Sequence, residues 1–269
     1  MLTRKPFSVR GMPGFALLAM VCFFALYMPL GPLVIYSFNA GENIALWEGF
    51  SLRWYYSAWE NELVQGATIR SLIVATCASF FATVLATMAA LGTTRTQPYR
   101  GQLSIYAMIN QPLMVPEIVT AVALLIVFAT IKAATDYHGF AYLIIAHTAF
   151  CIPFAYLPIR ARLEGMDLTL ETAAADLYAR PWKTFLRITL PLLLPGILAG
   201  AMLAFVISLD DVVITEFVKS AGQDTLPTYM LGQLRRNITP EINAISTVLL
   251  AVSVILVTLI FFLSRKRGT

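Results

Sequence analysis

Charged residues are scarce in this sequence. Of its 269 residues, 13% are Asp, Glu, Lys or Arg and 58% are hydrophobic, whereas an ordinary soluble domain has about 25% charged and roughly 45–50% apolar residues. Several apolar runs reach the ~20 residues with which an α-helix crosses the ~30 Å hydrocarbon layer of a membrane. Because the alternating pattern of barrel strands is absent, the composition predicts an all-α, polytopic membrane protein.

Catalytic and metal-binding motifs are also missing. The sequence contains no GxxxxGK[ST], HExxH or GxSxG, and neither His138 nor His147 has a cysteine or acidic partner at metal-ligand spacing. Cys22, Cys77 and Cys151 are widely spaced within apolar runs, which indicates lipid- or core-facing thiols. We therefore expect no enzymatic activity, metal or cofactor on this chain. His147 is interpreted as a hydrogen-bonded packing residue, with a relay or ligand role as the alternative.

Six apolar ranges are long enough to form membrane spans. The third is too long for one straight crossing and contains Pro112 and Pro116, so we expect it to be kinked or broken. The first exceeds the apolar core of a signal peptide, about 7–15 residues, and we expect it to be retained. Internal repeats and linkers are absent, so residues 1–269 are predicted to form a single transmembrane domain. The predicted spans are about 14–37, 68–91, 103–131, 139–160, 190–212 and 243–264.

Basic residues are distributed unequally between the two sides of this arrangement. By the positive-inside rule, both termini and the loop at 160–187 face the cytoplasm. The net charge of +4 is explained by this topology, so a nucleic-acid partner is not expected. The basic residues on the predicted cytoplasmic side are Arg4, Lys5, Arg10, Arg95, Arg100, Arg160, Arg162, Arg180, Lys183, Arg187, Arg265, Lys266 and Arg267.

A polar, helix-forming segment at 169–189 separates two apolar spans. Thr169 is suited to cap a helix, Glu171 favours its first turn, and Pro181 ends or restarts it. The segment predicts a short helix across the membrane surface, which either docks in a groove of another protein or rests on lipid headgroups. The apolar residues at helical spacing are Leu170, Ala173, Ala174 and Leu177.

This segment resembles the EAA loop of the permease subunits of ATP-binding-cassette importers. The resemblance implies that its helix sits in a cleft of an ATPase subunit and transmits that subunit's closing. Thr172 stands at the family's Glu and Tyr178 at its usual Gly. Because glycine permits a bend or close packing, Tyr178 predicts either an uninterrupted helix or a ring that covers the ATPase surface. The implied coupling residues are Glu171, Thr172, Ala173, Ala174, Asp176, Leu177 and Tyr178.

Four acidic residues lie within or at the ends of spans, where charges are costly and usually functional. They are Glu117, Asp210, Asp211 and Glu216, and no basic residue is evidently their partner at the level of sequence. Such a cluster favours a path for a cationic ligand. As alternatives, Asp210 and Asp211 cap the end of a span in contact with water, and Glu117 pairs with Arg70, which can otherwise snorkel to the interface.

Aromatic residues gather in the outer loop that follows the first span. They are best interpreted as an interfacial belt. As the alternative, Trp54 and Tyr55 stack on a polyamine or contact a binding protein, because aromatic rings attract ammonium groups. The loop's aromatic residues are Trp47, Trp54, Tyr55, Tyr56 and Trp59.

Further patches resemble the permeases of spermidine/putrescine importers. They include Ser208-Leu209-Asp210-Asp211, Val115-Pro116-Glu117-Ile118 and Thr239-Pro240-Glu241. The resemblance implies the type I importer permease fold, with six transmembrane helices and a cytoplasmic coupling helix, in the bacterial inner membrane. It also implies a second permease subunit, two ATPase subunits that hold ATP and Mg, and an extracytoplasmic substrate-binding protein. Alternatives are a permease for an opine or other amino-acid derivative, ferric iron or thiamine, a secondary transporter, and a structural membrane scaffold.

Overall fold

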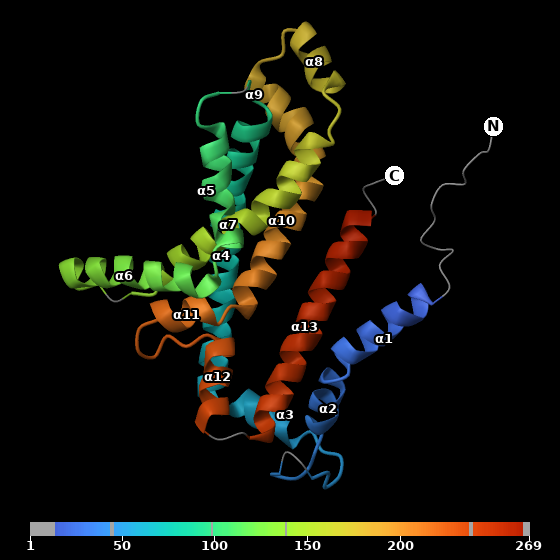
Figure 1. Cartoon of the computed structure of the whole chain (residues 1–269), viewed down its shortest axis with the longest axis vertical. Helices are drawn as coiled ribbons and strands as arrows, with labels where there is room; N and C mark the ends of the chain where they lie inside the picture. The colour runs from blue at the N-terminus through green and yellow to red at the C-terminus, as the bar shows by residue number, and fades with distance from the viewer. Residues whose placement is uncertain (1–13, 44–45, 98, 138, 237–238, 266–269) are drawn as a thin grey trace. The chain divides into compact units, whose positions relative to one another are not determined.

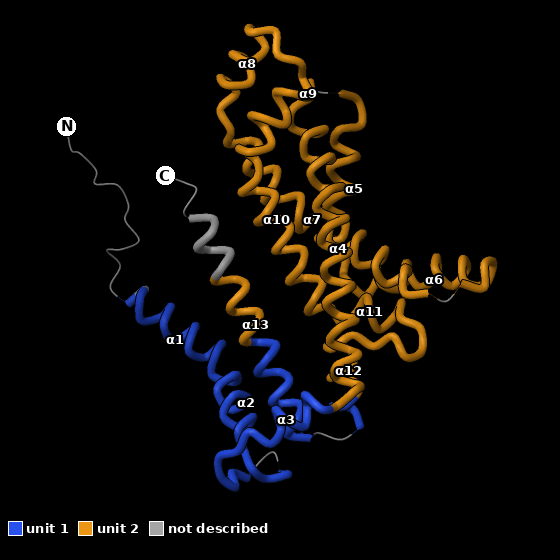
Figure 2. Tube along the Cα trace, turned by 180° about the vertical axis from the view of Figure 1, so that it is seen from behind, with its two compact units in different colours: residues 1–60, 233–250 blue, residues 61–232, 251–269 orange. Residues whose placement is uncertain are grey.

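The computed structural model describes residues 14–43, 46–97, 99–137, 139–236 and 239–265. The predicted tail residues Arg4, Lys5, Arg10, Lys266 and Arg267, and also His138, lie outside the described residues. Contacts divide the chain into two compact units, residues 1–60 with 233–250 and residues 61–232 with 251–269 (Figure 2). The prediction of a single domain stays a prediction.

The first unit contains the bent N-terminal span. Helices α1 (Phe15–Tyr27) and α2 (Leu30–Tyr36) meet at an angle of 41°. Pro29 and Pro32 explain the bend, because a proline lacks the N–H that continues a helical hydrogen-bond ladder. The outer loop then forms α3 (Arg53–Glu60), and α13 (Pro240–Arg265) contributes its first residues to this unit.

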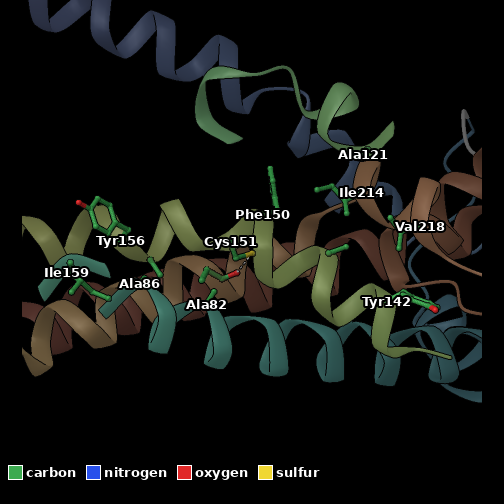
Figure 3. Packing of buried hydrophobic residues seen from close by; sticks show 14 of the residues in the cluster. Ala82, Ala86, Ala121, Tyr142, Phe150, Cys151, Tyr156, Ile159, Ile214 and Val218 are labelled. Carbon is green, nitrogen blue, oxygen red and sulfur yellow. Dashed lines mark hydrogen bonds between the residues drawn. The ribbon is translucent and has the colours of Figure 1, made fainter. Parts of the chain in front are cut away.

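Three long helices form the core of the second unit: α4 (Glu62–Thr94), α7 (Ala141–Glu164) and α10 (Leu190–Asp210). One face of α4 consists of alanines with no solvent exposure, so that the neighbouring backbones approach closely, as is common between membrane helices. Figure 3 shows two of them, Ala82 and Ala86, beside the residues of α7. The fully buried alanines of this seam are Ala67, Ala75, Ala78, Ala82, Ala86 and Ala90.

The contact between α7 and α10 depends on glycine. A Cβ atom on Gly200 would lie 2.7 Å from the backbone oxygen of Ala155. Nearby, the thiol of Cys151 donates to the carbonyl of Ala204 at 3.5 Å, as drawn in Figure 3. Only a residue without a side chain allows α10 to come so close to the α7 backbone.

The third predicted span is broken, as its prolines indicate. Helix α5 (Gln102–Met114) ends at an extended Val115, and α6 (Glu117–Thr135) begins after Pro116. Helix α6 is directed away from the three-helix core (Figure 1) and packs against α11 (Val213–Val218). The break therefore places Glu117 in the first turn of α6, next to the end of α10.

The segment between α7 and α10 forms α8 (Thr169–Asp176), α9 (Pro181–Thr184) and the π-helix η2 (Phe185–Thr189), which continues into α10. Figure 1 shows α8 and α9 at one end of the second unit. After α11, helix α12 (Leu226–Arg236) follows. The described residues contain five helices long and apolar enough to span a membrane, or six with the bent pair α1–α2.

Candidate functional site

A carboxylate fixes the start of α8. Oδ1 of Asp167 accepts hydrogen bonds from the backbone N–H of Thr169 at 2.9 Å and from its hydroxyl at 2.5 Å. These bonds lower the pKa of Asp167. The prediction that Thr169 caps the helix is wrong, because its hydroxyl donates to Asp167 and does not accept from the first turn of α8.

The end of α8 forms a Schellman turn around a tyrosine. The N–H of Ala179 bonds to the carbonyl of Ala174 at 3.0 Å, and the N–H of Tyr178 bonds to that of Ala175 at 2.9 Å. Tyr178 adopts the left-handed conformation with φ 55°. The alternative of an uninterrupted helix is therefore wrong, and the turn is made by a residue that is 96% exposed.

The predicted coupling residues divide between two faces of α8. Ala174 is buried, and Glu171 accepts a hydrogen bond from the hydroxyl of Thr189 at 2.9 Å. Both residues therefore face the chain itself. The residues on the outward face are exposed: Thr172, Ala173, Asp176, Leu177 and Tyr178.

The predicted path residue Asp211 lies in a buried hydrogen-bond network at the junction of α10 and α11. Its Oδ2 accepts from the N–H of Thr215 at 2.9 Å and from the hydroxyl at 3.0 Å, and it lies 3.4 Å from Nε2 of His147. His147 also bonds to Ser208 at 2.8 Å and to Thr215 at 2.9 Å. The interpretation of His147 as a hydrogen-bonded packing residue is confirmed, and Asp211 caps the first turn of α11.

The other predicted path residues occupy different environments. Asp210 is exposed at the last residue of α10, and Glu117 is half-buried with its side chain within hydrogen-bonding reach of Asp211. Glu216 forms an ion pair with Lys219, so the expectation that no basic residue pairs with these acids is wrong for Glu216. The structure thus brings Glu117 to Asp211, leaves Asp210 exposed as the residue before Asp211, and gives Glu216 a partner of its own.

Two basic residues near this region have specific partners. Arg70 donates through Nε to the carbonyl of Asp224 at 2.8 Å, and the neighbour of Glu117 is Asp211, so the contacts do not support the alternative in which Arg70 pairs with Glu117. Burial lowers the pKa of Lys219, but hydrogen bonds to Asp224 and Glu216 outweigh this and raise the pKa above its ordinary value. The pairing of Lys219 with Glu216 was detectable, because i and i+3 are neighbours on a helix.

The two singled-out aromatic residues differ in exposure. Trp54 is buried beneath the guanidinium of Arg53, which lies 4.8 Å from its ring centroid. Tyr55 shares a hydrogen bond of 2.7 Å with the hydroxyl of Ser37 and packs against Phe38. Both are therefore engaged within the first unit, whereas Tyr56 and Trp59 are exposed.

Several known proteins are similar to this chain in sequence or in fold. The sequence model of the family described as binding-protein-dependent transport system inner membrane component matches residues 82–267. The putrescine transport system permease protein PotI of Escherichia coli K12 is 39% identical over 84% of this chain and 81% of its own length. The spermidine/putrescine transport system permease protein PotC of Haemophilus influenzae is 35% identical, covering 90% of this chain and 93% of its own.

A solved structure confirms the fold at lower sequence identity. A chain of a bacterial ABC transporter that imports the acidic polysaccharide alginate superimposes with a TM-score of 0.71, covering 94% of this chain and 95% of that one, at 16% identity. The predicted fold class, an all-α polytopic permease of the type I importer fold, is therefore confirmed. Since the family model and the relatives extend over most of the sequence, the chain belongs to the family of inner membrane components of binding-protein-dependent transport systems.

Proposed function

We propose that this chain is a permease subunit of an ATP-driven importer, and that it forms half of a path for a polyamine such as putrescine or spermidine. The names of its relatives support this substrate class. The structural observation that carries it is the exposed carboxylate of Asp210 at the end of α10, next to Asp211, which Glu117 approaches within hydrogen-bonding reach. Carboxylates pair with ammonium groups. The neighbouring Asp211 is itself engaged, since it bonds to Thr215 and faces His147.

The transport step makes and breaks no bond in the substrate. An extracytoplasmic binding protein would deliver the amine to this chain and a second permease subunit. Two partner ATPase subunits would hold the ATP and Mg. One of them would dock on the exposed face of α8, where Ala173 and Leu177 offer a small residue and an apolar anchor. Both termini and α8 would lie on the cytoplasmic side of the bacterial inner membrane.

Asp210→Asn tests the substrate class. In proteoliposomes with the complete importer, uptake of radiolabelled putrescine or spermidine should fall by about tenfold, since a hydrogen bond to a charged group contributes about 1.5–3 kcal/mol. Asp136→Asn is the matched control: this exposed residue has φ 52°, a conformation that asparagine also tolerates. Unlabelled amines should compete with the label, and thiamine or ferric iron should not. Undiminished uptake by Asp210→Asn, or competition by thiamine or iron, would contradict the proposal.

A further inference from the structure

One carboxylate oxygen attaches α8 to two spans. Oε1 of Glu171 accepts the hydrogen bond from the Thr189 hydroxyl and lies 3.7 Å from Nη2 of Arg95. Thr189 is the last residue of η2, which leads into α10, and Arg95 directly follows α4. The short α8 thus touches the ends of two elements of the core through a single side chain.

Glu171 points toward the chain. Its side chain is 24% exposed, and that of Arg95 is 19% exposed. The resemblance assigns Glu171 to the contact with the ATPase, but its Oε1 is already engaged by Thr189 and faces Arg95. The surroundings of the Glu171 side chain therefore fit a contact within this chain better than a contact with the ATPase.

The Arg95 guanidinium has unused hydrogen-bonding capacity. Its Nε and Nη2 atoms are buried without a hydrogen-bond partner. The separation of 3.7 Å from Glu171 exceeds an ordinary hydrogen bond of about 2.7–3.2 Å. A short movement of α8 toward α4 would close this gap into a charge-assisted hydrogen bond, which is among the stronger polar contacts in proteins. The contact between Glu171 and Arg95 is therefore open in this structure, and Arg95 has the free donors that a closed contact would need.

The other half of the link ends in an unusual helix. Thr189 is buried, and the residues before it form the π-helix η2, a form that occurs mostly as short insertions, often at functional sites. Helix α8 packs against α9 and η2. A displacement of α8 consequently acts on η2 through Thr189 and on α4 through Arg95.

We infer that Glu171 is a positioning residue that joins α8 to α4 and to η2, and that carries a displacement of α8 to both spans. The inference rests on the proposed docking of α8 to a partner ATPase. It assigns the two faces of α8 different tasks, since the face with Ala173 meets the partner and the face with Glu171 holds the spans.

Variants on the two faces separate these tasks in the assembled importer. Ala173→Arg should lose co-purification of the ATPase, because a long charged side chain does not fit a groove that accepts alanine. Glu171→Gln should keep co-purification, while the amine taken up per ATP hydrolysed falls about fivefold or more. Glu164→Gln is the matched control, because its ion pair with Arg160 lies within α7; it should couple like the unaltered chain.

The outcomes of these experiments test the role of Glu171 separately from the docking of α8 to the ATPase. Retention of the ATPase by Ala173→Arg would overturn the docking of α8 itself. Loss of the ATPase in Ala173→Arg together with normal coupling in Glu171→Gln would overturn only the role of Glu171 as a link between α8 and the spans. Loss of the ATPase in Glu171→Gln would overturn that role as well, because it would place Glu171 in the contact with the ATPase.

Charge exchange gives a test that does not depend on the single variants folding. Arg95→Glu and Glu171→Arg should each reduce membrane accumulation or coupling, and the double variant should recover coupling, since the arginine at 171 can still donate to the Thr189 hydroxyl. If coupling in the double variant is as low as in the worse single variant, the proposed link between Glu171 and Arg95 is wrong.

Discussion

Tyr178 keeps a backbone conformation that ordinarily favours glycine. A residue with a Cβ atom is destabilised in the left-handed region by roughly 1–2 kcal/mol. The turn nevertheless forms, because both Schellman hydrogen bonds are made. Leu177 and Tyr178 remain exposed on the outward face of α8. The strained position thus presents a large aromatic ring where the family usually has no side chain.

The strain at Tyr178 can be separated from the effect of its ring. Tyr178→Gly removes both, whereas Tyr178→Ala removes the ring and keeps a Cβ atom at φ 55°. We expect the amide of Ala179 to exchange about fivefold more slowly with solvent in the glycine variant than in the alanine variant, a difference of about 1 kcal/mol. Hydrogen-exchange mass spectrometry of peptides covering α8 measures it, and equal exchange in the two variants would show that the turn is unstrained.

For single residues, the sequence predicted the role of a side chain better than it predicted the residues that the side chain contacts. The hydrogen-bonded role of His147 followed from a lone imidazole in an apolar span. Its bonds to Ser208 and Thr215 could not be predicted, because they join residues 61 and 68 positions away. The pairing of Glu171 with Arg95 was equally hidden, since it depends on where α8 folds back onto the end of α4.

Among the elements, close packing rather than hydrophobicity distinguishes the core helices. Lipid tails are as apolar as leucine, so the helices gain by bringing backbones together over small residues. The alanine seam of α4 and Gly200 of α10 serve this purpose. The break in the third span was predictable from its prolines, whereas the π-helix η2 has no comparable signal.

Gly200→Ala tests the close approach of α10 to α7. The new Cβ would meet the Ala155 backbone oxygen at 2.7 Å, so the backbones must separate, at about 1–3 kcal/mol. We expect a lower midpoint of thermal unfolding in detergent. Gly92→Ala, also within a helix but with nothing within 4 Å, should leave the midpoint unchanged or raise it. Equal midpoints for the two variants would mean that the α7–α10 contact tolerates a methyl group.

At the scale of the whole molecule, the distribution of basic residues predicts how the chain lies in the membrane. The loop carrying α8 is assigned to the cytoplasm, and the end of α6 to the opposite side. The fold alone cannot decide this orientation, because the contacts between the helices are the same for both directions of insertion in the membrane. The sequence therefore contributes information about topology that the arrangement of helices does not contain.

Cysteine labelling tests this orientation. Ala134→Cys and Ala175→Cys place exposed thiols in the last turn of α6 and in α8. A membrane-impermeant maleimide added to spheroplasts should label the first variant, and label the second only after the membrane is opened. The unaltered chain, whose Cys22, Cys77 and Cys151 lie in the predicted spans, is the control. The reverse labelling pattern would place α8 outside.

The alanine seam of α4 also limits how this protein can change over generations. Alanine codons all begin with GC, so a single base change that replaces alanine yields glycine, serine, threonine, valine, proline, aspartate or glutamate. Every one of these except glycine is larger than alanine, and the alanines of the seam have no solvent exposure, so a larger side chain would have to displace its neighbours. A one-base replacement of Ala78, Ala82 or Ala86 thus enlarges the residue unless it gives glycine, and these positions should change little unless α7 or α10 changes with them.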